Sequence, residues 1–93
     1  MTVLVVSKVP AALRGRLTRW MIQLRPGVFV GTMSHRVRER LWARTCIAVR
    51  GGWALILVSA PTEQGFELRL HGEAPIALED FDGLWLVKRR ISL

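Results

Sequence analysis

The chain has 93 residues, of which 51% are hydrophobic, a composition that excludes general disorder and fits one small domain over residues 1–93. Its apolar runs are too short to span a bilayer, and the N-terminal one is followed rather than preceded by Lys8, unlike a signal peptide. We therefore expect a cytoplasmic protein without a membrane partner, and the single Cys46 agrees with a reducing compartment.

Positive charge is concentrated in the first half of the chain. The net charge is +7, but residues 1–50 carry +9 and residues 51–93 carry −2. Concentrated positive charge attracts polyanions such as nucleic acid. Twelve of the 14 basic residues are Arg, which a GC-rich genome would also favour. Such a bias does not explain why Glu39 is the only acid among the first 50 residues.

The first predicted elements are a strand and a helix. Residues 2–7 are apolar and rich in β-branched side chains, a pattern typical of a strand that a helix covers. Residues 11–25 show apolar side chains at three- and four-residue steps, which predicts one long helix. The apolar stripe of this helix consists of Leu13, Leu17, Trp20, Met21 and Leu24.

A second strand and helix follow. A turn at residues 25–27 precedes a short strand at 28–30. Ser34 can cap a helix that continues to about Val49 and is ended by Gly51-Gly52. Its predicted core-facing residues are Val37, Leu41, Thr45 and Ala48.

The second half predicts three strands. Residues 53–59 form a buried strand, and after a turn at 61–65 the alternation of residues 66–70 indicates a strand with one wet face. Residues 72–83 are interpreted as a loop, and residues 84–87 as the last strand. The order β-α-β-α-β-β-β predicts an α+β two-layer sandwich with the helices on one sheet face, and a second copy of the chain is the simplest cover for the other.

The second predicted helix carries Arg36, Arg40 and Arg44 on one side. Like charges at this spacing repel each other, and Glu39 points elsewhere. An ordinary solvated helix face usually mixes positive and negative charges. Phosphate binding therefore explains the pattern better than a solvated face does. The candidate DNA-binding residues are Arg14, Arg16, Arg36, Arg38, Arg40 and Arg44.

The four tryptophans are predicted to pack in or beside the core, which favours duplex backbone over single-strand stacking. His35 and His71 lack ligand-spaced partners, and Cys46 has no evident base. We therefore predict no catalytic residue, no metal and no cofactor.

Short motifs in a set order cover nearly the whole chain. They are residues 9–10, 13–17, 25–31, 37–39, 65–67 and 82–84, with Trp20, Ser34 and Trp42. Together they resemble the small CRISPR-associated adaptation protein, the second of the two universal CRISPR-associated proteins, in its type I-E subgroup. The family is often labelled an endoribonuclease.

The resemblance implies a ferredoxin-like fold, with the third strand reduced to about residues 31–33, and a homodimer. It also implies a role in spacer acquisition. In the subgroup, the dimer sits between two dimers of the CRISPR integrase and supports the middle of a double-stranded spacer precursor.

The same resemblance implies roles for individual residues. Arg14 and Arg36 match basic positions that touch DNA, and Arg16 and Arg38 match their neighbours. Glu63 and Asp82 match acidic positions at the integrase-facing surface. The C-terminal strand and tail, residues 84–93 with Leu84 and Leu86, are implied to dock on the integrase.

Two departures from the family pattern matter. Relatives often carry a carboxylate at the end of the first strand, proposed to bind a divalent metal, where this chain has Ser7. The alternative function, a magnesium-dependent endonuclease acting on single-stranded RNA or double-stranded DNA, is weakened accordingly, and a toxin-like RNA-cleaving domain lacks a visible acid–base pair. A basic pair of some relatives falls at about Pro75-Ile76, and Arg69 or the helix arginines are candidates to replace it.

Overall fold

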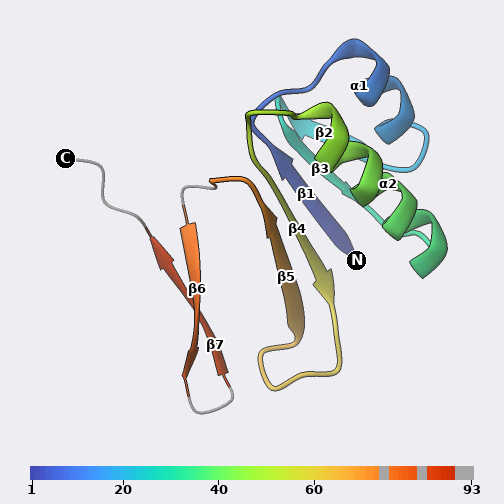
Figure 1. Ribbon diagram of the computed structural model, residues 1–93. Helices are drawn as coiled ribbons and strands as arrows, with labels where there is room; N and C mark the ends of the chain where they lie inside the picture. Colours follow the sequence, from blue (N-terminus) through green and yellow to red (C-terminus); the bar gives the residue numbers. More distant parts are fainter. Residues whose placement is uncertain (74–75, 82–83, 90–93) are drawn as a thin grey trace.

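The computed structural model describes residues 1–73, 76–81 and 84–89 of an α+β domain (Figure 1). In chain order its elements are β1 (Thr2–Val6), α1 (Ala11–Leu17), β2 (Ile22–Arg25), β3 (Val28–Gly31), α2 (His35–Ala48), β4 (Ala54–Ser59), β5 (Phe66–His71), β6 (Ile76–Phe81) and β7 (Leu84–Arg89). Five strands form an antiparallel sheet in the order β2-β3-β1-β4-β5, and β6 pairs with β7 in a separate two-stranded sheet.

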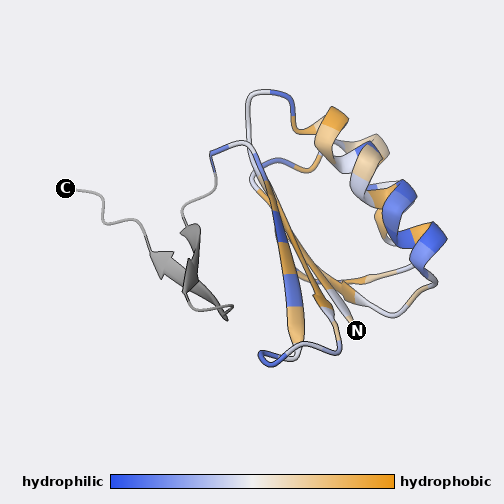
Figure 2. Cartoon of the chain, turned by 60° about the horizontal axis from the view of Figure 1, so that its bottom comes forward, coloured by the Kyte–Doolittle hydropathy of each residue, from blue (hydrophilic) through white to orange (hydrophobic). Residues whose placement is uncertain are grey.

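The strand order is compatible with a ferredoxin-like fold. The central strand β1 pairs with β3 on one side and β4 on the other, so that Val3 lies between Val30 and Leu57. Both helices lie on the same face of the sheet (Figures 1 and 2). The predicted two-layer arrangement with helices on one face is therefore confirmed.

Along β1, β3 and β4, both faces of the sheet are apolar. Side chains that alternate along β1, β3 and β4 pack against the helices, and Leu4, Phe29 and Ile56 are among the buried ones. From α1 and α2, Leu17 and Leu41 complete this core. The half-buried side chains between them face the other way, where the described part of the chain places no helix. They form two rows across the sheet, Val30-Val3-Leu57-Leu68 and Val28-Val5-Leu55-Leu70.

The first helix is shorter than its apolar spacing predicted. It ends at Leu17 rather than near residue 25, because the chain turns back and β2 pairs with β3. Gly27 at the turn has φ 82°, which glycine adopts without strain after Pro26. Met21 is buried as predicted, but Trp20 is 50% exposed and Leu24 is 64% exposed.

Two further predictions about strands were wrong. The third strand is not reduced to residues 31–33, because β3 spans Val28–Gly31 and Thr32 already lies outside it. The predicted loop over residues 72–83 contains β6, which pairs in register with β7, for example Leu78 with Val87.

The second helix begins and ends where the sequence predicted. The Ser34 hydroxyl accepts the Val37 N–H at 3.3 Å and caps the first turn, and Val49 is the C-cap residue. Inside the helix, Leu41 and Thr45 are buried, and the Thr45 hydroxyl donates to the Leu41 carbonyl at 2.7 Å. The strands β4 and β5 also follow the predicted ranges closely.

Neither helix of the described residues combines the length and the apolar character that crossing a membrane requires.

Candidate nucleic-acid interface

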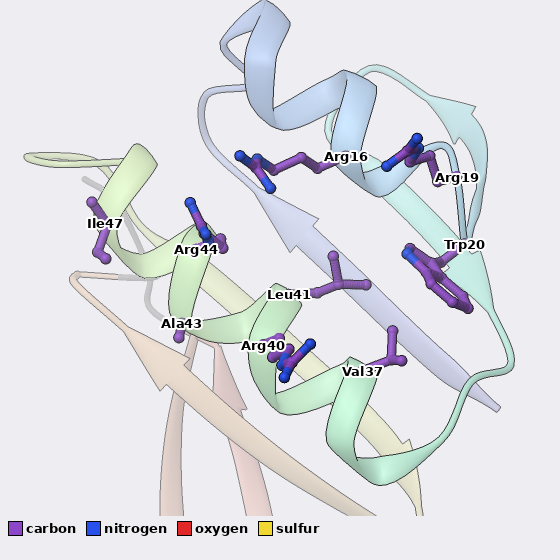
Figure 3. A pocket seen from close by; sticks show the side chains of 9 residues that line it. All are labelled: Arg16, Arg19, Trp20, Val37, Arg40, Leu41, Ala43, Arg44 and Ile47. Carbon is purple, nitrogen blue, oxygen red and sulfur yellow. The ribbon is translucent and has the colours of Figure 1, made fainter.

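A groove of about 430 Å³ lies between α1 and α2 on the side of the helices that faces away from the sheet (Figure 3). Its walls come from the last turn of α1, the turn that follows it, and the outer side of α2. The lining residues are Arg16, Arg19, Trp20, Val37, Arg40, Leu41, Ala43, Arg44 and Ile47.

Helix periodicity explains why these side chains meet. Leu17 is directed into the core, so the adjacent Arg16 lies at the border of α1 and extends toward α2. On α2, Arg40 and Arg44 are one turn apart and share the exposed side, whereas Leu41 is 8% exposed and forms the floor. The groove therefore combines an apolar floor with guanidinium groups around its rim.

The four guanidinium groups of the rim have no acidic partner within the described residues. The ion pairs of that part of the chain both involve Glu39, which contacts Arg69 at 2.7 Å and Arg38 at 4.0 Å. Anionic ligands can therefore approach the groove without displacing an internal carboxylate.

Glu39 is held on the other side of α2. Arg69 of β5 donates from Nη1 to both carboxylate oxygens, at 2.8 and 2.7 Å, and its guanidinium carbon lies 5.5 Å from the Trp42 ring centroid. The hydrogen bond from Arg69 lowers the pKa of Glu39, with smaller contributions from the charges of Arg69, His35 and Arg38. The prediction that Glu39 points away from the arginine stripe is consistent with this geometry.

The structure brings together only some of the six arginines predicted to bind DNA. Arg16, Arg40 and Arg44 line the groove, while Arg14 and Arg36 are exposed outside it. Arg38 is turned toward its own helix, where its Nη2 lies 2.8 Å from His35 Nδ1.

Sequence reasoning missed two residues of the groove. Arg19 was not singled out, and Trp20 was wrongly expected to pack in or beside the core. The two are adjacent in the turn after α1, and an arginine next to an aromatic residue is a combination that single-strand binding surfaces use. Their exposure was not predicted because apolar residues continue at helical spacing through Trp20 and Leu24, which indicated a helix with Trp20 on its buried side.

Comparison with known protein families finds a match over most of the chain. The model of the CRISPR-associated protein family Cas_Cas2CT1978 matches residues 1–86. The chain belongs to this family. The match includes β1, both helices and the groove between them, and it confirms that the protein is a Cas2-like CRISPR protein.

In this Cas2-like protein, the end of β1 carries a hydroxyl with a structural contact. The Ser7 Oγ accepts the Trp53 N–H at 2.8 Å, and the Ser7 N–H donates to the Trp53 carbonyl at 3.0 Å. A Cβ at Gly52 would collide with the Ser7 hydroxyl, so the glycine is needed for this close approach. Ser7 thus ties the end of β1 to the loop after α2.

Two further kinds of candidate, the Cys46 nucleophile and a metal site, are considered for the described residues. Burial raises the pKa of the Cys46 thiol, which packs against the core. Within the ranges that the structure describes, no three His, Cys, Asp or Glu side chains gather as a metal site would require.

The predicted integrase-docking residues of the Cas2-like chain are only partly visible. Glu63 is exposed in the turn between β4 and β5. Asp82 lies outside the described residues. Leu84 and Leu86 belong to β7, whose backbone pairs with β6, but their side chains lie outside what is described.

Proposed function

We propose that this Cas2-like protein is a non-catalytic adaptor of CRISPR adaptation, of the type I-E subgroup. As a homodimer it bridges dimers of the CRISPR integrase and holds the double-stranded spacer precursor by its backbone phosphates. The observation that carries the proposal is the arginine-rimmed groove, whose four guanidinium groups lack an acidic partner in the described chain.

Arginine suits this role because its planar fork can bond two phosphate oxygens at once. Arg14 and Arg36 extend the basic surface beyond Arg16, Arg40 and Arg44, because all five are exposed on the helix layer. A ligand that follows these residues must be a repeating polyanion rather than a single small anion. Duplex DNA, with one charge per about 1.7 Å of its axis, meets that requirement.

The homodimer is supported by the sheet face opposite the helices. Val3, Val5, Leu55 and Leu57 occupy the middle of the two apolar rows on β1 and β4. A second copy packed on these rows would remove apolar surface from water, worth about 25 cal/mol per Å². Such a dimer carries one helix layer on each outer side. The arginine surface is then doubled and can make ~6–10 phosphate contacts.

Integrase docking is assigned to the opposite end of the chain. The residues proposed to face the integrase are Glu63 in the β4–β5 turn, Asp82, and Leu84 and Leu86 of β7. Glu63 and Asp82 are acidic, so these two positions do not compete with the helix layer for DNA phosphates.

The endonuclease alternative is not favoured by the residues present. A shared magnesium ion needs oxygen ligands such as carboxylates, and the end of β1 supplies a hydroxyl that is already bonded to Trp53. We therefore propose no cofactor and no catalytic residue. Magnesium-dependent cleavage that disappears in Ser7→Ala, in protein free of contaminating nuclease, would revive this alternative.

The proposal is tested by titrating labelled duplex DNA with the protein, alone and together with the integrase, at several salt concentrations. Affinity should fall steeply with salt, and spacer insertion by the integrase should require the protein. A flat salt response would remove the electrostatic argument. Deleting residues 84–93 should abolish integrase binding before DNA binding, and complex formation that survives the deletion would contradict the docking assignment.

A further inference from the structure

We infer that the groove between α1 and α2 also receives an unpaired nucleotide, with Trp20 as the stacking platform for its base. The inference rests on the proposed function in one respect, that the ligand is nucleic acid. It goes beyond that function because holding a duplex by its phosphates uses no aromatic side chain.

The backbone of Trp20 is held by contacts on both sides of the residue. Its N–H donates to the Leu17 carbonyl at 3.0 Å, which closes the turn after α1. Its carbonyl oxygen lies against β3 so closely that a Cβ at Gly31 would come within 2.6 Å of it. Trp20 is nevertheless 50% exposed, although it carries a large apolar side chain. A platform on a rigid turn requires little ordering when a base stacks on it.

The surroundings of the indole match the two parts of a nucleotide. Trp20 lies at one end of the groove, close to Val37 and Leu41, whereas Arg16 and Arg44 lie toward the other end (Figure 3). Trp20, Val37 and Leu41 offer an apolar surface for the faces of a base, and the guanidinium groups of the groove offer donors for phosphate oxygens. The volume of about 430 Å³ falls in the range of ~300–1,000 Å³ typical of small-ligand sites.

Only an unpaired base can use this site. In a duplex, the faces of each base are covered by its neighbours, so an indole can stack only on a base at an end, in a gap or in a single strand. Aromatic stacking next to a positively charged groove is the usual arrangement of single-strand binding proteins. The protein is therefore expected to bind DNA with a single-stranded segment more tightly than a blunt duplex of equal charge.

The test compares a short fluorescein-labelled oligo-dT with a blunt duplex, using the full-length protein and three variants. Trp20→Ala should weaken oligo-dT binding by roughly 5- to 150-fold, since one stacked base contributes about that much at other sites, and should weaken duplex binding much less. Trp20→Phe should retain most of the affinity because the ring remains. Ile22→Ala is the matched control, because Ile22 is 71% exposed and lies outside the groove.

A second readout separates stacking from a structural role. Binding of unlabelled oligo-dT should quench tryptophan fluorescence in the wild type, and Trp20→Phe should remove most of this quenching while binding persists. Thermal unfolding of each variant verifies that the fold is intact.

Several outcomes would overturn the inference. One is a Trp20→Ala protein that binds oligo-dT as well as the wild type does, or that loses oligo-dT and duplex binding equally. Another is poly-glutamate competing with oligo-dT as strongly as unlabelled oligo-dT does, which would point to an acidic peptide instead. If duplex binding remains salt-dependent while Trp20→Ala has no effect, only the stacking site fails. If neither DNA binds, the proposed function fails as well.

Discussion

Replacing Arg40 and Arg44 by alanine removes two of the four guanidinium groups around the groove without touching its floor. Both side chains are exposed and make no ion pair within the described residues. Alanine also has a high helix propensity, so α2 should keep its stability. We expect the double variant to fold normally and to bind duplex DNA with a weaker dependence on salt.

The size of this effect follows from counterion release. Each phosphate that a protein neutralises on duplex DNA contributes about 0.9 to the slope of log affinity against log salt. Losing two contacts in one chain should reduce the slope by about 1.8, and losing them in both chains of a dimer should reduce it by about 3.6. The measured change therefore also reports how many copies of the groove engage one duplex.

Fluorescence anisotropy titrations across a salt series measure both slopes. The charge-matched control is Lys8→Ala with Arg25→Ala, two exposed residues outside the groove. An unchanged slope for Arg40→Ala with Arg44→Ala, or an equal change in the control, would refute the assignment of phosphate contacts to the groove.

Four further changes probe other parts of the chain. Arg14→Ala with Arg36→Ala should weaken duplex binding and spacer insertion while circular dichroism stays unchanged; normal insertion would remove both residues from the DNA-binding set. Gly15→Ala places a methyl group in open space on α1 and should stabilise the protein by roughly 0.5–1 kcal/mol in thermal unfolding. A DNA backbone that approaches Gly15 closely would make the same variant bind more weakly. Leu57→Asp places a charge in the middle of the open sheet face and should convert a dimer to a monomer in sedimentation experiments, whereas an unchanged mass would contradict the proposed interface. Glu39→Gln should lower the melting temperature near neutral pH, because the depressed pKa of Glu39 means that its charged form stabilises the fold. The difference in melting temperature between Glu39→Gln and the wild type should shrink as the pH falls below 4.5, the ordinary pKa of a glutamate, and should vanish below the lowered pKa of Glu39. A difference that does not depend on pH would contradict this role of the Glu39 charge.

The elements that local sequence decides were predictable. The β-branched run of β1 and the Ser34 cap of α2 each specify their structure over a few residues, and both were placed correctly. The strand β2 was missed because its identity depends on pairing with β3, which the helical spacing of Leu17, Met21 and Leu24 conceals. Pro26-Gly27 between two apolar runs was the available signal for a hairpin.

The strand β6 was missed for a related reason. Its residues were grouped with the surrounding Gly, Pro and acidic residues as a loop. Asp82-Gly83 is a strong hairpin signal that joins residues 76–81 to the predicted last strand, and giving it more weight would have revealed the pair.

The candidate site was predictable in charge but not in shape. The spacing of Arg40 and Arg44 on α2 showed that they share a side, and helical geometry is enough for that conclusion. That Arg16 joins them, and that Arg14 does not, depends on how α1 packs against α2. The position of Trp20 depended on where α1 ends, so one wrong boundary removed the aromatic part of the groove.

Because Glu39 pairs with Arg69, the repulsion among the arginines of α2 is not offset when no ligand is bound. Arg36, Arg40 and Arg44 repel one another by roughly 0.2–0.5 kcal/mol per neighbouring pair, and the nearest carboxylate is occupied on the other side of the helix. A bound polyanion relieves this self-repulsion, so by linkage the ligand-loaded fold is the more heat-resistant one. Under the proposed function, the complex with DNA should therefore unfold at a higher temperature than the free protein.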